Sequence, residues 1–246
     1  LCGGCGGLVA GARAASRRPG IAGGKRRQTI HMSTLPRKAP FITFEGGEGA
    51  GKTTQTRQLA DRLAGLGIDC LVTREPGGSP FAEEIRALLL SGDLPARGAM
   101  ADALLFLAAR ADHVARLIRP ALECGAWVVC DRFLDSSRAY QGGGGKIDDA
   151  DILALHRIGS GGLLPDLTLL IEVPADQVAQ RLARRDGGES DRIGGREVAF
   201  HERVRQAFSQ FAEAEPNRFV RIDGSGPVEQ THAAIMQAVA PLLDTR

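Results

Sequence analysis

From residue 41 onward, short apolar runs alternate with longer segments whose apolar residues recur every three or four positions. The runs are rich in Val, Ile and Leu without polar alternation, which predicts strands buried on both faces. These strands span residues 41–45, 68–73, 126–130, 167–173 and 218–222. The periodic segments predict helices at 54–66, 80–90, 96–123, 148–158, 175–186, 196–214 and 227–243. Such alternation predicts an α/β fold, a doubly wound parallel five-stranded sheet with ligands at the carboxyl ends of its strands.

The longest predicted helix carries an apolar stripe that should face the core, made of Met100, Leu104, Ala111, Val114, Ile118 and Leu122. Phe106 lies about 200° around this helix from Leu104, so it points away from the stripe and is free to contact a ligand. Two other segments lack periodicity. Gly142 to Gly145 predicts a flexible loop, and Arg181 to Arg196 is an insertion rich in arginine and glycine.

The charge distribution narrows the range of partners. Eight of the 31 Lys and Arg residues lie within residues 1–40, which hold no Asp or Glu, so 23 basic residues face all 29 acidic ones in the rest of the chain. This acidic balance disfavours nucleic acid as a partner, because such binding depends on neutralising phosphates. No apolar run approaches the ~20 residues that span a bilayer, so no membrane is expected as a partner.

Residues 1–38 are predicted to be a disordered N-terminal extension, followed by one domain over 39–246. The first 31 residues are rich in Gly, Ala and Arg and have no periodicity. A basic leader without acids can be a transit peptide. The chain opens with Leu1, however, and Met32 followed by Ser-Thr-Leu would be a natural start, which favours an upstream extension of the reading frame.

The five cysteines indicate a reducing compartment. Cys2 and Cys5 form a CxxC pair, but no second pair of Cys or His completes a zinc site. Cys70, Cys124 and Cys130 fall in or beside apolar segments, which predicts buried free thiols. A cytoplasmic location follows from these features.

The segment from Gly46 to Thr53, GGEGAGKT, matches the phosphate-binding pattern G-x-x-x-x-G-K-[ST]. A predicted strand leads into it and a predicted helix leads out, which is the context that the motif requires. Its glycines let backbone N–H groups and the helix N-terminus face an anion. Lys52 can then reach the outer phosphates, and the Thr53 hydroxyl can bind Mg²⁺.

An acidic residue followed by a basic one, Asp131-Arg132, ends the predicted strand 126–130. In phosphate-loop proteins an acid at this place commonly faces Mg²⁺. A strand-terminal Asp on its own is more often a helix cap or a turn residue. The adjacent Arg132 favours the functional interpretation of Asp131, because a guanidinium pointing into the same crevice suits a second phosphate.

Eight segments in order resemble thymidylate kinase: GGEGAGKTT (46–54), TREPGG (73–78), EEIR (83–86), LLFLAAR (104–110), CDRF (130–133), SSRAYQGG (136–143), PDLTLLIEV (165–173) and SDRI (190–193). The resemblance covers nearly all of residues 41–246. It implies a phosphate-loop nucleoside-monophosphate-kinase fold with a small lid at about 181–196. The implied reaction transfers the γ-phosphoryl group of Mg-ATP to dTMP and gives dTDP, in an enzyme that is usually a homodimer.

The resemblance also implies roles for individual residues. ATP would be bound by Gly46, Gly47, Glu48, Gly49, Ala50, Gly51, Lys52, Thr53 and Thr54, with Thr53 and Asp131 as metal ligands. The dTMP pocket would comprise Glu48, Glu75, Arg86, Phe106, Arg110, Arg132, Ser137, Tyr140 and Gln141. Phe106 would stack on thymine and Arg110 would bond a base carbonyl. Tyr140 would crowd the 2′ position of the sugar, Glu48 would bond its 3′-OH, and Arg86 and Arg132 would hold the phosphate.

Phosphoryl transfer needs positive charge near the transferring group. Some relatives place an arginine in the phosphate loop, where this chain has Gly49, so the charge is expected from the lid. Its candidates are Arg181, Arg184, Arg185, Arg192 and Arg196, of which Arg185 and Arg192 are the predicted catalytic donors beside Lys52 and Arg132. Gly194 replaces an acid usual in the lid, and Arg138 stands where relatives often have a small or amide residue, close enough to alter the acceptor pocket.

Two other functions compete with this interpretation. Another nucleoside-monophosphate kinase would share the phosphate loop, Asp131-Arg132 and the lid, but not the TREPGG and AYQGG segments together. A GTP-dependent switch protein needs an Asn-Lys-x-Asp motif, and the one asparagine, Asn217, is followed by Arg218 and Phe219. The switch interpretation therefore fails.

Overall fold

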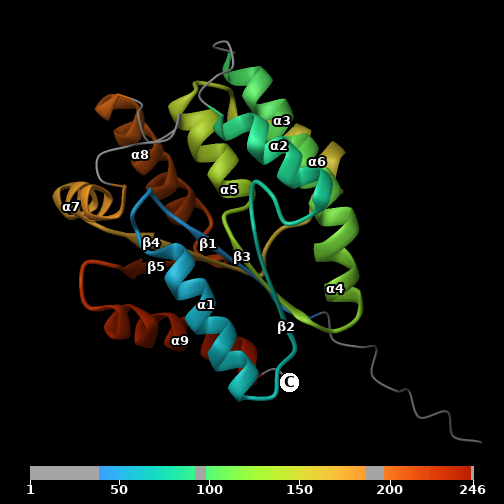
Figure 1. Cartoon of the computed structure of the whole chain (residues 1–246), viewed down its shortest axis with the longest axis vertical. Coiled ribbons are helices and arrows are strands. Elements are labelled where there is room, and N and C mark those ends of the chain that lie inside the picture. Colours follow the sequence, from blue (N-terminus) through green and yellow to red (C-terminus); the bar gives the residue numbers. More distant parts are fainter. Residues whose placement is uncertain (1–38, 92–97, 187–196, 245–246) are drawn as a thin grey trace, which may run out of the picture. The chain divides into compact units, whose positions relative to one another are not determined.

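The structure, a computed structural model, describes residues 39–91, 98–186 and 197–244. Five strands form one parallel sheet in the order β2-β3-β1-β4-β5 (Figure 1). They are β1 (Phe41–Glu45), β2 (Cys70–Arg74), β3 (Trp127–Asp131), β4 (Leu167–Glu172) and β5 (Phe219–Asp223). The predicted parallel five-stranded α/β sheet is confirmed, with each strand within two residues of its expected bounds.

The helices are α1 (Lys52–Gly65), α2 (Pro80–Leu90), α3 (Ala99–His113), α4 (Arg119–Glu123), α5 (Leu134–Ser137), α6 (Asp149–Ser160), α7 (Ala175–Asp186), α8 (Val198–Ala214) and α9 (Val228–Asp244). A π-helical segment, η1 (Val114–Ile118), joins α3 to α4, so the expected long helix is present without a break from Ala99. A second π-helical segment, η2 (Arg138–Gly144), continues α5. Neither α5 nor η2 was expected from the sequence.

The helices cover both faces of the sheet. In Figure 1, α1 and α9 lie side by side on one face, and α3, α4, α6 and α8 lie on the other. β1 is central and pairs with both β3 and β4, so its end meets the end of β3 with Phe44 opposite Asp131. Because all strands are parallel, their carboxyl ends meet at one edge, where the loops that carry polar residues also gather.

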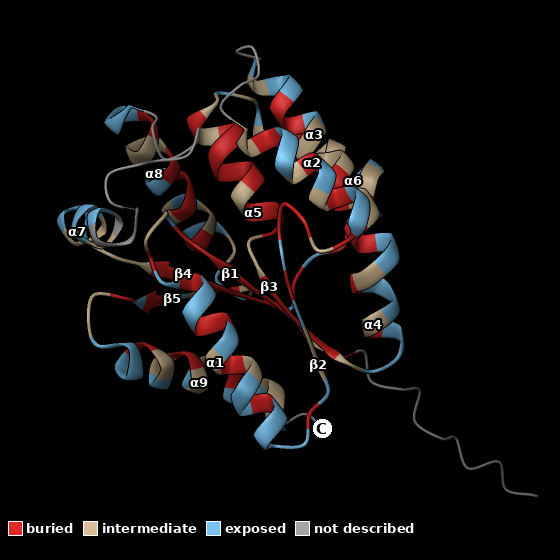
Figure 2. Ribbon diagram, in the orientation of Figure 1, coloured by how far each residue is buried: buried red, intermediate tan, exposed pale blue. Residues whose placement is uncertain are grey.

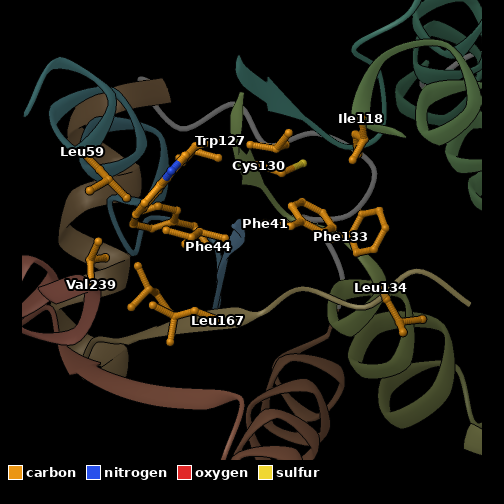
Figure 3. Close-up of a cluster of buried hydrophobic side chains, with 14 of the residues drawn as sticks. Phe41, Phe44, Leu59, Ile118, Trp127, Cys130, Phe133, Leu134, Leu167 and Val239 are labelled. Atoms are coloured by element: carbon orange, nitrogen blue, oxygen red, sulfur yellow. The ribbon is translucent and has the colours of Figure 1, made fainter. Parts of the chain in front are cut away.

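The core consists of apolar side chains on both faces of the central strands, which are buried along their length (Figure 2). Leu59 of α1 and Val239 of α9 reach the core from one side and are fully buried there (Figure 3). Towards the other side the rings of Phe41 and Phe133 meet edge to face, with centroids 4.9 Å apart. Strands covered on both faces explain why their sequences lack polar alternation.

The predicted apolar stripe of the long helix is only half correct. Ile118 and Leu122 are buried, but Met100 and Leu104 are 43% and 48% exposed. The reason is that α3 packs mainly against α2 and α6. Its buried face there is formed by other residues, namely Asp102, Ala103, Ala109, Arg110 and His113.

The prediction of a flexible loop at Gly142 to Gly145 was wrong. Gly142 to Gly144 close η2, and α8 packs directly against them. A Cβ on Gly144 would lie 2.4 Å from the Phe200 ring, and one on Gly143 would lie 2.6 Å from the Cβ of Ala207. These glycines allow two helical segments to approach closely, which is a packing function rather than flexibility.

The cysteine prediction holds for Cys130, which is buried, and partly for Cys70, which is half-buried; Cys124 is exposed. All three are free thiols. None of the helices in the described ranges has the length and apolar character needed to cross a bilayer. The predicted extension 1–38 and the lid residues 187–196 lie outside the described residues.

Candidate active site

A cavity of about 560 Å³ opens at the carboxyl ends of the central strands. It brings together most of the predicted site residues: Glu48, Gly49, Gly51, Lys52, Thr53, Thr54, Glu75, Arg86, Phe106, Arg110, Asp131, Arg132, Ser137, Tyr140 and Gln141. The predicted residues Gly46, Gly47 and Ala50 belong to the same loop but do not line the cavity. Further lining residues are Arg74, Pro76, Leu90, Phe133, Ser136 and Arg181.

The phosphate loop runs from the end of β1 to the start of α1. Gly46 has φ 130°, and a Cβ there would lie 2.3 Å from the carbonyl oxygen of Ile171, so only glycine fits. Gly51 has φ 90° and caps α1. Lys52 is buried and folds back over the loop, where its Nζ donates to the carbonyl oxygens of Gly46 at 3.1 Å and Gly47 at 2.6 Å. The cation is thus held above the loop, at the N-terminus of a helix that favours anions.

The charge of Lys52 depends on pH in the neutral range. Burial, and then the neighbouring Arg132 guanidinium, lower the pKa of Lys52 to about 7. The carboxylates of Asp131, Glu45 and Glu48 act in the opposite direction. Because anionic phosphates favour the charged form, ligand binding should raise this pKa.

Binding of the ATP that the sequence leads us to expect should therefore take up a proton at Lys52 above neutral pH. At pH 8 we expect an uptake of up to about 0.9 proton per ATP, with affinity falling as the pH rises further because the amine must first be protonated. Isothermal titration in two buffers of different ionisation enthalpy measures this uptake. Lys52→Arg, whose guanidinium does not titrate, should abolish it. Uptake that persists in this variant would assign the proton to another group.

Two oxygen ligands suited to a magnesium ion meet where β3 ends and α1 begins. The Thr53 hydroxyl donates to Oδ2 of Asp131 at 2.5 Å. Mg²⁺ prefers oxygen ligands and is usually bound by one or two protein groups together with substrate phosphates. Within the described ranges no group of three or more His, Cys, Asp or Glu side chains could hold a metal alone. The Thr53 hydroxyl and the Asp131 carboxylate thus offer oxygen ligands of the kind that Mg²⁺ prefers.

Arg132 occupies a strained turn directly after β3. Its φ is 69°, a region that residues other than glycine rarely adopt, at a cost of roughly 1–3 kcal/mol. The fully buried Glu45 holds this turn: it accepts from the backbone N–H of Phe133 at 2.8 Å and of Ser136 at 3.2 Å, and from the Ser136 hydroxyl at 2.6 Å. Burial, and next the Asp135 carboxylate, raise the pKa of Glu45 above its usual range.

The Arg132 guanidinium is fixed between the phosphate loop and η2. Its Nη1 donates to the Gly46 carbonyl at 3.2 Å and to the Ser136 hydroxyl at 3.0 Å. Its Nη2 donates to the Tyr140 hydroxyl at 3.3 Å, and its Cζ lies 5.0 Å from the centroid of the Tyr140 ring. A guanidinium oriented in this way suits a phosphate bound between the phosphate loop and η2.

The opposite wall of the cavity is formed by α3 and the segments that pack on it. Phe106 is half-buried and packs against the apolar cluster that α2 and Ala109 of α3 form together. Arg110 is 3% exposed; its Nε donates to Oε2 of Glu75 at 2.7 Å and its Nη2 to the Ser137 hydroxyl at 2.8 Å. An aromatic face beside a fixed guanidinium suits a planar base with carbonyl oxygens.

Two further residues of the predicted site, Glu75 and Arg86, lie in the turn after β2 and in α2. The Glu75–Pro76 peptide bond is cis. Arg86 of α2 donates from Nη1 to the Pro76 carbonyl at 2.7 Å, which places its guanidinium beside this turn and on the cavity wall. Arg74 also lines the cavity and pairs with Glu83 at 3.0 Å.

The lid arginines are only partly described. Arg181, in α7, lines the cavity, and its Nη2 donates to the Gly224 carbonyl at 2.8 Å. Arg185 lies in α7, but its side chain is outside the described residues, as are Arg192 and Arg196 altogether. The predicted roles of Arg185 and Arg192 therefore stay predictions.

Arg138 does not line the cavity, although its place next to Ser137 in the sequence had suggested that it could affect the site. It turns away from the cavity and pairs with Asp135 at 3.1 Å, Asp149 at 2.8 Å and Glu215 at 2.6 Å. Its Cζ lies 3.9 Å from the centroid of the Phe211 ring. The substitution is accommodated because these three carboxylates, on α5, α6 and just after α8, surround the guanidinium.

Sequence reasoning missed Glu45 and His113, both of which support the site from behind. Glu45 is an acid at the end of an apolar strand, directly before the phosphate loop, and that position is a usable signal. His113 lies in a helix among apolar residues and gives no signal without its partners. Ser136 and Arg74 were missed as separate positions although they lie in motifs that were identified.

The parallel sheet and the groups around its cavity define a phosphate-loop phosphotransferase that brings two phosphate-bearing substrates together. The thymidylate kinase family model matches residues 44–235. The chain is 53% identical to thymidylate kinase of Rhizorhabdus wittichii, over 82% of this chain and 98% of that protein. It is 49% identical to thymidylate kinase of Caulobacter vibrioides, over 82% and 97%. The chain therefore belongs to the thymidylate kinase family.

The fold agrees with a solved structure of the same family. The crystal structure of thymidylate kinase from Ehrlichia chaffeensis superposes with a TM-score of 0.68 at 32% sequence identity. The similarity covers 82% of this chain and 98% of that one. The similar arrangement supports comparing the two sites element by element.

Proposed function

We propose that this cavity is the site at which the protein, as a thymidylate kinase, transfers the γ-phosphoryl group of ATP to dTMP, giving dTDP and ADP for dTTP synthesis. The observation that carries the proposal is the continuity of the cavity. It runs from the phosphate loop, past Arg132, to the wall formed by Phe106 and Arg110. The family model, which spans residues 44–235, supports a kinase domain over 39–246.

In the proposed mechanism, an oxygen of the dTMP phosphate attacks the γ-phosphorus of ATP, and the bond to the β-phosphate oxygen breaks. Lys52 and Arg132 stabilise the charge on the transferring group, together with a lid arginine. Thr53 and Asp131 would hold Mg²⁺, which supplies further positive charge to the phosphates when bound. Catalysis rests on positioning and electrostatics, so no covalent enzyme intermediate is needed.

In the proposed acceptor pocket, Phe106 stacks on thymine and Arg110 donates to a base carbonyl, with Ser137 and Gln141 beside them. Arg86 and Arg132 hold the phosphate, and Glu48 accepts from the sugar 3′-OH. Glu75 contributes through Arg110, to which it is bound. These assignments rest on the positions of the residues around one cavity and on the family to which the chain belongs.

An ADP-release assay on residues 32–246 with Mg-ATP tests the acceptor. The panel consists of dTMP, dUMP, UMP, CMP, AMP and GMP. We expect turnover of dTMP well above that of every ribonucleotide. Preference for a ribonucleotide would retain the kinase chemistry but overturn the roles of Phe106, Ser137 and Tyr140.

Omitting magnesium and adding EDTA should abolish turnover, and activity without a divalent ion would contradict the proposed role of Thr53 and Asp131.

Tyr140 should act as the gate for deoxyribose. Its ring is held in the cavity wall by Phe200 and Phe208, with centroids 6.2 Å and 6.3 Å away. Replacing it in Tyr140→Leu should reduce the preference for dTMP over its 2′-hydroxylated counterpart roughly tenfold, because the ring no longer excludes the hydroxyl. Tyr140→Phe keeps the ring and should keep the preference. An unchanged ratio of kcat/KM values in Tyr140→Leu would contradict the gate.

We also propose a homodimer formed through α2, α3 and α6, of which α3 packs against both of the others. Large apolar side chains are exposed on all three helices: Phe81, Leu88, Met100, Leu104, Leu153 and Ile158. A second copy of the chain would cover such a surface. The other half of the predicted stripe on α3, which the chain itself leaves exposed, would be buried in this way.

Sedimentation velocity tests the dimer. Ile158→Lys places a charge where a residue is 77% exposed, and we expect dissociation at concentrations at which the wild type is dimeric. Val198→Lys on α8, where Val198 is 86% exposed, is the matched control and should stay dimeric. Monomeric wild-type protein, or equal effects of the two variants, would exclude this surface as the dimer interface.

A cytoplasmic location is proposed as well, supported by the three free thiols.

A further inference from the structure

His113 is a buried polar residue to which the mechanism above assigns no role. It ends α3, has no exposed surface and does not line the cavity. Its Nδ1 lies 3.1 Å from Oε1 of Glu75, and its Nε2 lies 2.7 Å from the hydroxyl of Thr73 on β2. A carboxylate can only accept, so Nδ1 carries a proton, and in the neutral ring Nε2 accepts from Thr73.

Glu75 connects this histidine to the acceptor wall. Its second oxygen, Oε2, accepts from Nε of Arg110 at 2.7 Å. Burial alone would raise the pKa of Glu75, but the Arg110 guanidinium and the hydrogen bond from His113 outweigh it and hold the pKa below its usual value. The carboxylate is therefore ionised at neutral pH and fixed at both oxygens.

The contacts of Arg110 leave one end of its guanidinium for a ligand. Nε is bound to Glu75, and Nη2 donates to the Ser137 hydroxyl at 2.8 Å and to the Phe133 carbonyl at 3.0 Å. Within the described part of the chain, Nη1 makes no hydrogen bond, and Arg110 lines the cavity. The direction of Nη1 is thus determined by the groups that hold the other two nitrogens.

The backbone at Gly78 approaches the His113 ring closely. A Cβ on Gly78 would lie 2.4 Å from His113 Nε2 and 2.6 Å from the Thr73 hydroxyl, so the turn after β2 closes directly on the ring. An apolar side chain of similar size could fill the space, but it would leave one oxygen of a buried carboxylate unbonded, which is costly. The hydrogen bonds, rather than the volume, are what this position supplies.

We propose that His113 is a positioning residue for acceptor recognition: through Glu75 it fixes the Arg110 guanidinium so that Nη1 faces the base of dTMP. The inference rests on the proposed role of Arg110 in the acceptor pocket. Loss of the histidine should weaken dTMP binding, because Glu75 and Arg110 gain freedom that the ligand must then remove. It should leave ATP binding and phosphoryl transfer largely intact, because Lys52, Asp131 and Arg132 have other supports.

Two substitutions at His113 separate this role from packing. His113→Leu keeps the bulk without the donor, and His113→Asn keeps an amide N–H near the position of Nδ1. We expect His113→Leu to raise the KM and Kd for dTMP about tenfold, with kcat and the KM for ATP within about twofold of wild type. His113→Asn should restore most of the loss. Thr73→Val, which removes only the outer hydroxyl, provides a milder variant and should raise the dTMP Kd about threefold.

A double-mutant cycle with Arg110→Lys shows whether the effect passes through Arg110. Arg110→Lys alone should raise the KM for dTMP, and adding His113→Leu should then have little further effect. Independent, additive effects would overturn the inference, as would a fall in kcat at unchanged KM, which is the sign of a purely structural role. If Arg110→Lys leaves the KM for dTMP unchanged, the proposed acceptor site itself is wrong.

Discussion

Replacing Lys52 by alanine should reduce kcat about 10³-fold or more, because the transferring phosphoryl group loses a cation held in a buried site. The ammonium sits over the phosphate loop on two carbonyl oxygens, and no other described lysine lines the cavity. Steady-state kinetics with Mg-ATP and dTMP measures the loss. Arg57→Ala, on the exposed face of the same helix, is the matched control and should keep wild-type turnover.

The fold should survive the Lys52→Ala change, because the cation contacts only the loop. Circular dichroism and a melting curve that match the wild type would show this. Near-normal turnover by a folded Lys52→Ala protein would falsify the assignment of this lysine to catalysis. Lys52→Arg keeps the charge but replaces a compact ammonium with a planar fork, so we expect an activity between those of the alanine variant and the wild type.

Replacing Asp135 by alanine should lower the free energy of unfolding by about 3–5 kcal/mol, because it removes a fully buried carboxylate that pairs with two largely buried arginines, Arg138 and Arg218. Asp135 has no exposed surface. It accepts from both ends of the Arg218 guanidinium, at 2.6 Å and 3.0 Å, and from Arg138 at 3.1 Å. Urea denaturation at a fixed protein concentration measures the change.

Glu202→Ala is the matched control for Asp135, since Glu202 also pairs with an arginine three positions later, Arg205. That pair is exposed on both sides, so its loss should barely move the midpoint. If the two substitutions destabilise the protein equally, the network around Asp135 contributes nothing beyond a surface ion pair. We expect the larger loss of stability in Asp135→Ala because its ion pairs are buried, whereas the pair of Glu202 is exposed.

The elements that could be predicted from the sequence are those whose signal is local. The strands are covered on both faces, so their apolar runs are continuous, and the phosphate loop requires Gly46 and Gly51 at backbone angles that only glycine adopts readily. Asp131 and Arg132 at the end of β3 could also be predicted from the local sequence. In each case a few neighbouring residues determine the local structure.

The parts that could not be predicted depend on residues far apart in the sequence. Glu45 holds the backbone of Phe133, 88 positions away, and His113 meets Glu75 across 38 positions. The glycines of η2 resemble a loop until α8 is placed against them. Likewise, periodicity cannot show whether an apolar residue such as Met100 is covered by its own chain. These features became visible only once the chain was folded.

The sheet and the helices carry different parts of the proposed site, and this affects how the acceptor specificity of the enzyme could change. Lys52, Asp131 and Arg132 lie at or after the carboxyl ends of β1 and β3, two adjacent central strands that pair from Phe41 opposite Val128 to Phe44 opposite Asp131. The proposed base pocket, by contrast, is built by α3 and η2, which pack mainly on other helices. Substitutions in these helices can therefore alter which base is accepted while the spacing of the reacting phosphates stays fixed. Selection or engineering for a new acceptor would change residues of the helices, and the phosphate-binding residues at the strand ends would stay the same.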